Sequence, residues 1–579
     1  MMQGNRIFGL ETEHGFSFRP VRDGRSPERE AVFAALCEAL DEKCPSLPEP
    51  EERRFIRFLA NGAKCYYDTG LLEWSTPECR SLRDLIACDK AGEQLISEIV
   101  VEAERLLARQ GFEGRLFVAK NNVDALGNTY GCHENYLLSR SPDLLDNQQD
   151  FFRLIVRQLV PFLVTRQILC GAGKVGPWLN TRDRALGYHV SQRAEFIGEV
   201  VSPETRFDRG IVNMRDEAQA DPARFRRLHL ILGDANLCEY STFLKVGTTA
   251  IVLSMIEDQF ITEDLALMEP RLSINQISYD PTCRRTIELR NGTRATAIAI
   301  QRRYLDLART YFAHETLDAE TQSVLYEWAD TLDKLGRDTE ELTSRVDWLI
   351  KLHLLRARGK KVAPGAEWSL ERGDHWEHPA LRELDLKYHV LRPEQSLYAV
   401  LERAGLVDHI VTPEEIARAR KFPPCDTRAK IRGDAIWGTL RKHSLALVDW
   451  EQIMFPGVAV ALLDPRDFFD PLVQAQVQDP RAEAFLCHRL ADPNSEVRRR
   501  AALALGALGS PTAYEPLLAR LQDPAEEVRA AAARGLGQLH ETRATAALQQ
   551  ARQDSCFQVR KAAEWALSRL SAGEERAWR

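Results

Sequence analysis

The sequence predicts an α+β fold followed by a stack of helical repeats. Strand-like runs rich in aromatic and branched residues are separated by long helices and by insertions of unequal length, which favours α+β over a regular doubly wound sheet. Near the C-terminus a pattern recurs every 31 residues, as expected for units that cover one another's apolar faces. The 579 residues, 44% of them hydrophobic, suffice for roughly three to four domains.

Four runs read as strands and three as helices. The strands are expected at "RIFGLETE" (6–13), "AKCYYD" (63–68), "RLFVAKNN" (115–122) and "LHLILGDAN" (228–236). Apolar residues at helical spacing predict long helices over 84–111, 147–169 and 343–359. A glycine- and proline-containing stretch at 358–380 predicts a loop, and a smaller unit follows from about residue 390 to 478.

The C-terminal repeat has a simple form. An aspartate, often followed by proline, precedes an Ala/Leu helix that has a Val-Arg pair near its start. The valines of these pairs are Val497, Val528 and Val559. The pattern resembles a short HEAT-type repeat. We therefore expect three parts, at residues 1–390, 391–478 and 485–572, of which the last is all-α.

Charge and cysteine usage narrow the function classes. The net charge is −8 and no basic arm or run is present, which argues against nucleic acid as the main partner. No segment approaches 18 consecutive apolar residues, so a membrane partner is not expected. The twelve cysteines are scattered without a CxxC pair, which favours a reducing compartment over a disulfide or zinc framework. The expected location is the cytoplasm.

Two strands each present a row of polar side chains on one face. Residues at i and i+2 of a strand point the same way, so Glu11 and Glu13 share a face, and so do Lys64, Tyr66 and Asp68. The two glutamates could simply lie on the solvated face of an edge strand. Alternatively, carboxylates at this spacing suit Mg²⁺, which commonly accompanies nucleotide phosphates.

Several ordered blocks resemble one family closely. They include "GLETEHG", "NGAKCYYDTGLLEWSTPEC", "KNNVDALGNTYGCHENYL", "PFLVTRQILCGAGKV", "SQRAEF", "IVNMRDE", "RRLHLILGDAN" and "DTRAKIRGDAIW". These blocks are similar to those of the Pup–protein ligases and of their sister enzymes, the Pup deamidases or depupylases. The resemblance runs from about residue 6 to about residue 470. It implies a glutamine synthetase-like curved β-sheet with packed helices, an ATP- and Mg²⁺-dependent activity, and a small Pup-like modifier protein as partner.

The resemblance also implies roles for individual residues. Asp68 falls on the catalytic aspartate of the family. Metal-binding roles fall to Glu11, Tyr66 and Glu73, with Glu13 beside them and His229 as a further ligand. Nucleotide-binding roles fall to Lys64, Thr76, Trp450 and Arg215. Without the resemblance, a lone histidine or arginine such as His229 or Arg215 would more often be structural.

Amide formation explains why a ligase needs these groups. A carboxylate resists attack by an amine until ATP converts it to an acyl phosphate, and Mg²⁺ neutralises charge on the phosphoryl group. The attacking lysine has a reference pKa of about 10.4, so a positioned aspartate that takes its proton contributes roughly 10²–10⁴-fold. In the deamidase branch the matching aspartate acts on an amide instead.

Departures from the family pattern leave the branch open. Lys64 stands where the ligases usually carry arginine, and Leu71-Leu72 replaces a His-Pro pair. The spacing from Asp68 to Glu73 equals that of the deamidases. The short connection between Glu13 and Asn61 and blocks such as "GNTYGCHENY" instead resemble the ligases. A ligase is the favoured interpretation and a deamidase or depupylase is the alternative.

Two hypotheses from other classes remain. The first is a small-molecule carboxylate–amine ligase in which the repeats form an oligomer contact. The second is a non-catalytic scaffold whose repeats do the binding, although the presence of Glu11, Tyr66, Asp68 and Glu73 disfavours it. For an enzyme that modifies proteins, we expect the repeats to recruit protein substrates.

Overall fold

The protein forms two compact units, Arg6–Phe422 and Pro423–Arg579, which are described separately. The computed structural model describes residues 6–21, 24–47, 53–68, 70–124, 127–139, 148–177, 179, 186–204, 208–215, 217–362, 373–442, 447–479 and 481–577.

A nine-stranded sheet within the described residues is the centre of the first unit. Its strands run in the order β2-β3-β4-β1-β6-β11-β10-β9, and β5 pairs with the second half of β1. All neighbours are antiparallel except β9 and β10. The strands of this sheet are β1 (Phe8–Pro20), β2 (Ile56–Phe58), β3 (Lys64–Asp68), β4 (Leu71–Ser75), β5 (Gly114–Ala119), β6 (Cys132–Ser139), β9 (Ile197–Ser202), β10 (Arg209–Asn213) and β11 (Phe225–Leu230).

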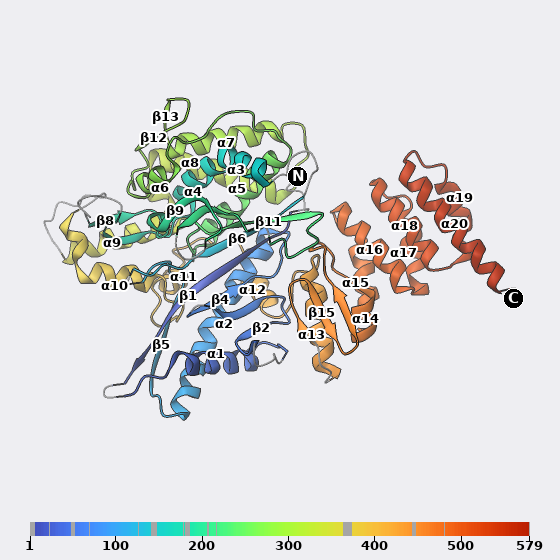
Figure 1. Cartoon of the computed structure of the whole chain (residues 1–579), viewed down its shortest axis with the longest axis horizontal. Helices are drawn as coiled ribbons and strands as arrows, with labels where there is room; N and C mark the ends of the chain where they lie inside the picture. Colours follow the sequence, from blue (N-terminus) through green and yellow to red (C-terminus); the bar gives the residue numbers. More distant parts are fainter. Residues whose placement is uncertain are drawn as a thin grey trace. The chain divides into compact units, whose positions relative to one another are not determined.

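Two small hairpins and the helices complete this unit (Figure 1). The hairpins are β7 (Lys174–Pro177) with β8 (Leu186–His189), and β12 (Thr286–Glu288) with β13 (Arg294–Thr296). The helices are α1 (Arg29–Lys43), α2 (Leu82–Arg109), α3 (Gln148–Gln158), α4 (Val160–Cys170), α5 (Glu239–Glu257), α6 (Pro270–Ser278), α7 (Ala297–Tyr311), α8 (Ala319–Arg337), α9 (Asp347–Val362), α10 (Pro379–Tyr388), α11 (Leu397–Arg403) and α12 (Pro413–Ala419), with short 3₁₀ turns at η2 (Ala194–Phe196), η3 (Thr339–Leu342) and η4 (Asp374–Glu377).

The four predicted strands are observed as β1, β3, β5 and β11, and the α+β class is confirmed, but the strand predicted over 115–122 ends at Ala119 and the one predicted over 228–236 ends at Leu230. The single helix predicted over 147–169 is wrong, because α3 ends at Gln158 and α4 begins at Val160. Pro161 explains the break, since proline has no N–H to donate to the preceding turn. The predicted loop at 358–380 begins too early, because α9 continues to Val362 and includes Gly359; residues 363–372 lie outside the described residues.

β1 divides the unit into an apolar side and a polar side. Leu10, Thr12 and His14 are buried, and the intervening Glu11 and Glu13 are only half-buried. This alternation is the period of two that a strand imposes. The buried side packs against α2, and neighbouring strands of the sheet pack in the same way against α4 and α5.

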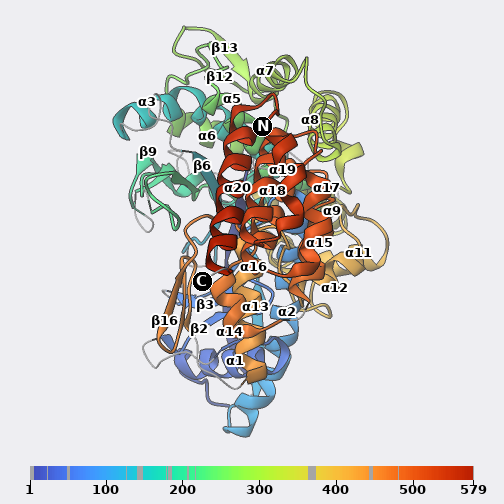
Figure 2. The same cartoon turned by 90° about the vertical axis from the view of Figure 1, so that its right-hand side faces the viewer.

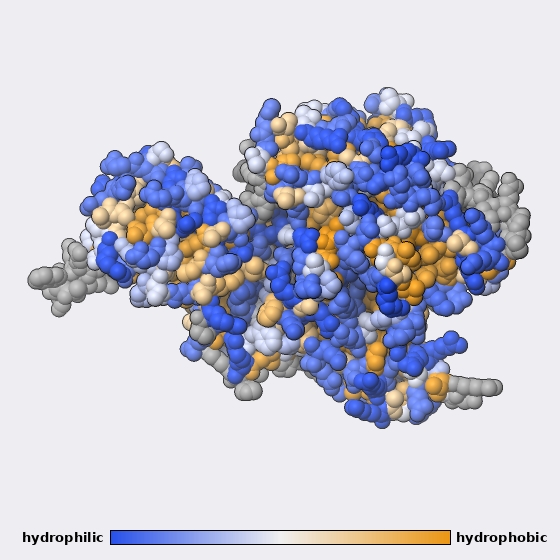
Figure 3. All heavy atoms as spheres, turned by 180° about the vertical axis from the view of Figure 1, so that it is seen from behind, coloured by the Kyte–Doolittle hydropathy of each residue, from blue (hydrophilic) through white to orange (hydrophobic). Residues whose placement is uncertain are grey.

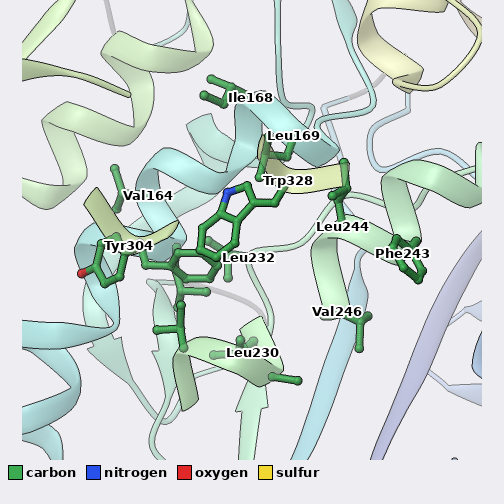
Figure 4. Packing of buried hydrophobic residues seen from close by; sticks show 14 of the residues in the cluster. Val164, Ile168, Leu169, Leu230, Leu232, Phe243, Leu244, Val246, Tyr304 and Trp328 are labelled. Carbon is green, nitrogen blue, oxygen red and sulfur yellow. The ribbon is translucent and has the colours of Figure 1, made fainter. Parts of the chain in front are cut away.

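The apolar core lies between the sheet and the helices α4, α5, α7 and α8. Trp328 of α8 is fully buried there, and Figure 4 shows its indole among side chains such as Val164, Tyr304 and Leu232. The indole N–H donates to Gln301 Oε1 at 3.1 Å. Burying an aromatic ring with its polar atom satisfied is strongly stabilising.

One buried ion pair joins the sheet to a helix. Arg166 of α4 donates to both carboxylate oxygens of Glu134 of β6, at 2.8 and 2.7 Å. The same carboxylate accepts from the Tyr136 hydroxyl at 2.6 Å. Both charged groups are almost fully buried. Glu134 lies between His133 and Asn135, which point to the opposite face of β6, so this pair also fixes their strand.

The second unit begins with α13 (Arg428–Lys442) and a small sheet of β14 (Leu447–Val448), β15 (Gln452–Phe455) and β16 (Val458–Ala461). Helix α14 (Pro471–Val477) packs on α13. The repeats follow as pairs of a short and a long helix (Figures 1 and 2). They are α15 (Ala482–Arg489) with α16 (Ser495–Leu508), α17 (Tyr514–Arg520) with α18 (Glu526–Gln538), and α19 (Thr545–Ala551) with α20 (Phe557–Ala577).

The recurring aspartate, valine and arginine of the repeats have different structural roles. The three valines of the pairs are buried, and Val497 belongs to the apolar cluster of the repeats. Arg498 donates to both oxygens of Asp523, at 2.9 and 2.8 Å, and Arg529 repeats the contact with Asp554, at 2.8 and 3.0 Å. These two arginines thus each bind the aspartate of the next repeat with two hydrogen bonds.

The small subdomain and the repeats share contacts. Phe468 belongs to the apolar cluster of the repeats, and Arg500 of α16 pairs with Asp464, at 3.0 Å, and with Asp467. The predicted division into residues 1–390, 391–478 and 485–572 stays a prediction about which segments fold alone.

The described helices include none that is both long and apolar enough to span a bilayer. On the face seen in Figure 3, hydrophobic side chains appear as patches among hydrophilic ones.

We predict that Arg166→Met lowers the free energy of unfolding by about 3–5 kcal/mol, because the Glu134 carboxylate would stay buried without its partner. Arg105→Met is the matched control, since Arg105 also pairs with a glutamate on a helix but is exposed; it should cost less than about 1 kcal/mol. Denaturant unfolding measures both. Equal losses in the two variants would contradict the role given to burial.

Candidate active site

The polar face of the main sheet gathers the candidate residues in two rows. Directly opposed residues of antiparallel strands point to the same face. The first row runs across three strands as Tyr66, Glu73 and Glu13. The second row runs across four strands as Lys64, Ser75, Glu11 and His133. β1 has neighbours on both sides, so the alternative of a solvated edge strand for Glu11 and Glu13 is wrong.

Glu11 lies at the centre of the hydrogen-bonded contacts. The Tyr66 hydroxyl donates to Glu11 Oε1, and His133 Nδ1 lies 3.5 Å from Glu11 Oε2. The other nitrogen of His133 lies 3.8 Å from Glu13 Oε1. Glu13 in turn accepts from the backbone N–H of Gly131 at 2.6 Å. The two carboxylates are therefore contacted by groups from two other segments, β3 and residues 131–133.

His229 of β11 joins this group from the next strand. Its Nδ1 lies 2.8 Å from Asn135 Oδ1, and its ring centroid is 5.1 Å from that of His133. Among the described residues, ligand atoms of Glu11, His133 and His229 lie within 4.8 Å of one another, a spacing that could hold a metal ion. Burial and the neighbouring charges of His133 and Arg227 hold the pKa of His229 well below its usual value, which keeps the imidazole neutral as a ligand must be.

The carboxylates repel one another strongly. Burial and the charges of Glu11 and Glu13 raise the pKa of Glu73 to about 9. Burial alone would also raise the pKa of Glu11, but His133, His229 and the Tyr66 hydroxyl lower it below the usual range. Several acids that cannot all ionise together are the donor set that a divalent cation neutralises. The residues present therefore fit a bound cation such as Mg²⁺.

Asp68 and Lys64 lie at opposite ends of β3. Asp68 is exposed at the end of the strand, opposite Leu71, where a substrate amine could reach it. Lys64 Nζ lies 4.1 Å from the centroid of the Tyr66 ring, within cation–π distance. Both side chains are on the face of the sheet that carries Glu11 and Glu13, as the alternation predicts.

The other predicted nucleotide-binding residues are placed differently. Arg215 lies just after β10; its Nε donates to Pro203 O at 3.1 Å, and its charge acts on both Arg227 and His229. Thr76 is buried and its hydroxyl accepts from the Leu10 N–H at 3.0 Å. Trp450 belongs to the second unit, where Arg432 stacks over its ring at 4.7 Å. A nucleotide contact stays a prediction for all three.

Four residues near the acids were not among the predicted site residues. Sequence reasoning could have found His133, because His133 and Asn135 are at positions i and i+2 of a strand and share its polar face. Arg193, Arg209 and Arg227 come from segments far away in the sequence, and only the folded sheet brings them together. The charge of Glu13 acts on Arg193 and Arg209, and that of Glu11 acts on Arg227.

Sequence comparison identifies the family of this chain. A sequence model described as Pup-ligase protein matches residues 6–454. The chain is 42% identical over 467 residues to a Pup–protein ligase of Acidimicrobium ferrooxidans, which covers 79% of this chain and 95% of that protein. It is also 38% identical over 442 residues to a depupylase of Acidothermus cellulolyticus, covering 75% and 80% of the two chains.

Solved structures agree with this assignment. A crystal structure of the ubiquitin-like protein Pup with its ligase PafA superposes with a TM-score of 0.72 at 32% identity, covering 83% of this chain and 93% of the other. PafA in complex with ADP gives a TM-score of 0.66 at 34% identity, covering 73% and 89%. HEAT-repeat models match residues 473–527 and 514–578, which confirms the predicted repeats. The chain belongs to the Pup-ligase family and carries HEAT repeats at its C-terminal end.

Proposed function

We propose that this protein is an ATP- and Mg²⁺-dependent ligase that joins the C-terminal glutamate side chain of a small Pup-like modifier to lysine amines of target proteins. The observation that supports this most directly is the set of Glu11, Tyr66, Glu73 and Asp68 on one face of the sheet. This set occurs in a chain 42% identical to a Pup–protein ligase. Because the reaction consumes ATP, the cytoplasm remains the expected compartment.

The site residues divide into a metal-binding set and a nucleotide-binding set. Glu11, Glu13, Glu73, Tyr66 and His229 would hold Mg²⁺. Lys64, Arg215, Thr76 and Trp450 would contact the nucleotide.

When bound, ATP supplies the phosphoryl group that turns the modifier carboxylate into an acyl phosphate, and Mg²⁺ neutralises the charge that builds up. The Tyr66 hydroxyl fixes the orientation of Glu11, and Glu73 is itself shielded from water. Asp68, exposed at the end of β3, would take the proton of the lysine amine as it attacks.

A depupylase remains the second candidate. The similarity to the Acidothermus protein is nearly as high as that to the ligases, and the spacing between Asp68 and Glu73 is that expected of the deamidase branch. A depupylase would cleave the isopeptide bond or a C-terminal glutamine amide without stoichiometric use of ATP. Counting ADP released per bond made or cleaved distinguishes the two.

Asp68→Asn should separate the two half-reactions. Acyl phosphate formation needs no base, so the variant should release ADP in a single turnover with the modifier. Amine capture does need a base, so isopeptide formation should fall by roughly 10²–10⁴-fold. Rapid-quench analysis of ADP and gel analysis of conjugates measure the two steps. Wild-type rates of conjugation in the variant would remove Asp68 from the mechanism.

Metal dependence should change in Glu11→Gln and Glu73→Gln. Each change keeps the side-chain shape but removes a charged oxygen ligand. The Mg²⁺ concentration for half-maximal activity should rise about tenfold or more, with melting temperatures near that of the wild type. Glu199→Gln, an exposed change on β9, is the control and should leave the Mg²⁺ requirement unchanged. An unchanged requirement in both test variants would show that the metal assignment is wrong.

The HEAT repeats should act in recruiting protein substrates. We expect a chain shortened to residues 1–479 to bind ATP·Mg²⁺ and to conjugate the modifier to a small amine at the wild-type rate. Protein acceptors should be modified several-fold more slowly, because the extended repeat surface is lost. A lower melting temperature is also expected, since Arg500 and the partners of Phe468 are removed. Equal rates on protein acceptors would contradict this role.

A further inference from the structure

The buried carboxylate of Asp234 accepts four hydrogen bonds. It is 3% exposed. Its Oδ2 accepts from the backbone N–H groups of Ala172 and Gln192 at 2.8 and 2.9 Å. Its Oδ1 accepts from the Ser191 hydroxyl and the Arg193 N–H, both at 3.0 Å. Hydrogen bonds to an ionised acceptor are among the strong ones in a protein, so this side chain binds the segment after α4 to the turn at 191–193.

The backbone around Asp234 is itself fixed. Lys245 of α5 donates from Nζ to the Asp234 carbonyl at 2.9 Å. The following N–H, of Ala235, donates to the side chain of Asn122 at 2.9 Å. The carboxylate is therefore anchored to a helix and to the loop after β5, and it can define the position of whatever it holds.

One of the groups it holds is Arg193, whose guanidinium lies beside the acidic cluster. Arg193 is 1% exposed, and it donates to Ile231 O at 2.7 Å and to Thr129 Oγ1 at 3.3 Å. A Cβ added at Gly131 would lie 3.1 Å from Arg193 Cζ. Gly131 is the residue whose N–H holds Glu13. The cation and the Glu13 carboxylate are thus packed against the same backbone segment.

We propose that Asp234 is a positioning residue, which holds the Arg193 backbone so that the guanidinium stays against Gly131 and fixes the Glu13 carboxylate in the acidic cluster. This inference rests on the proposed function, because it takes that cluster as the reaction centre. Asp234 itself touches none of the acids. Its effect passes through the Arg193 N–H, the guanidinium and Gly131. A displacement of about 1 Å in such a chain is enough to cost roughly 10²-fold in rate.

The test compares Asp234→Asn with Asn236→Ala. In Asp234→Asn the new side-chain NH₂ group would face backbone N–H donors, which it cannot accept from. The turn at 191–193 should therefore be displaced. Asn236 is equally buried, two residues away, and bonds Cys170 O and Asp347 instead, both at 2.9 Å. Both variants should lower the melting temperature. Only Asp234→Asn should lower kcat for ADP formation, by about 10–100-fold, with the KM for the modifier changed less than about threefold.

A second readout is independent of turnover. Binding of Mn²⁺, measured by electron paramagnetic resonance without nucleotide, should be several-fold weaker in Asp234→Asn and unchanged in Asn236→Ala. Equal Mn²⁺ affinity in the two variants would overturn the proposal. If the wild type binds Mn²⁺ but forms no conjugate, the proposed function is refuted. The Mn²⁺ affinities of the two variants would still test the positioning role of Asp234. If Asp234→Asn does not fold, Ser191→Ala, which removes one of the four bonds, should show the same changes at smaller size.

A double-mutant cycle tests the route through Arg193. In the Arg193→Met background, Asp234→Asn should change kcat by less than about threefold, because the group it positions is already gone. If the double variant instead lowers kcat by the product of the two single-variant factors, Asp234 acts independently of Arg193, and the assignment is overturned.

Discussion

The structure depends on the strict alternation of side chains along β1. This strand lies inside the sheet and pairs with three others, so every second residue must be compatible with the helical core. Leu10, Thr12 and His14 meet that requirement. Glu11 and Glu13 are consequently forced onto the other face, where β3, β4 and β6 deliver their own polar residues. A shift of one residue in register would exchange the two faces entirely, so the core and the site specify each other.

The acidic face is costly without a cation. Glu73 lies in a position where burial and two neighbouring carboxylates oppose its ionisation. The protein accommodates this cost through the surrounding scaffold, in which the Arg166–Glu134 pair and the bonds to Asp234 fix the strands and loops. A bound cation would relieve the repulsion among the acids and let Glu73 ionise.

Much of this arrangement was predictable from the sequence, and the reasons for the exceptions are physical. The faces of β1 and β3 followed from the period of two, and the repeats followed from the recurrence of Val497, Val528 and Val559. The break between α3 and α4 was missed because the apolar spacing continues across Pro161. Arg193 and Asp234 could not be assigned, since Arg193 lies 41 residues from Asp234 and 180 residues from Glu13 in the chain and no local pattern encodes such contacts. Trp450 lies in a separate unit, where sequence similarity alone suggests its role.

The arginine–aspartate clamps of the repeats give the solenoid a direction. Arg498 holds Asp523, and Arg529 holds Asp554, always from one repeat to the one that follows. Each 31-residue period carries one arginine donor and one aspartate acceptor. A duplicated period inserted in frame would therefore bring an arginine for the repeat after it and an aspartate for the repeat before it, and the same ion pair would form at both new junctions. Lengthening this region by duplication needs no compensating change at either side of the insertion, whereas inserting part of a period would leave one charge of a clamp without its counterpart.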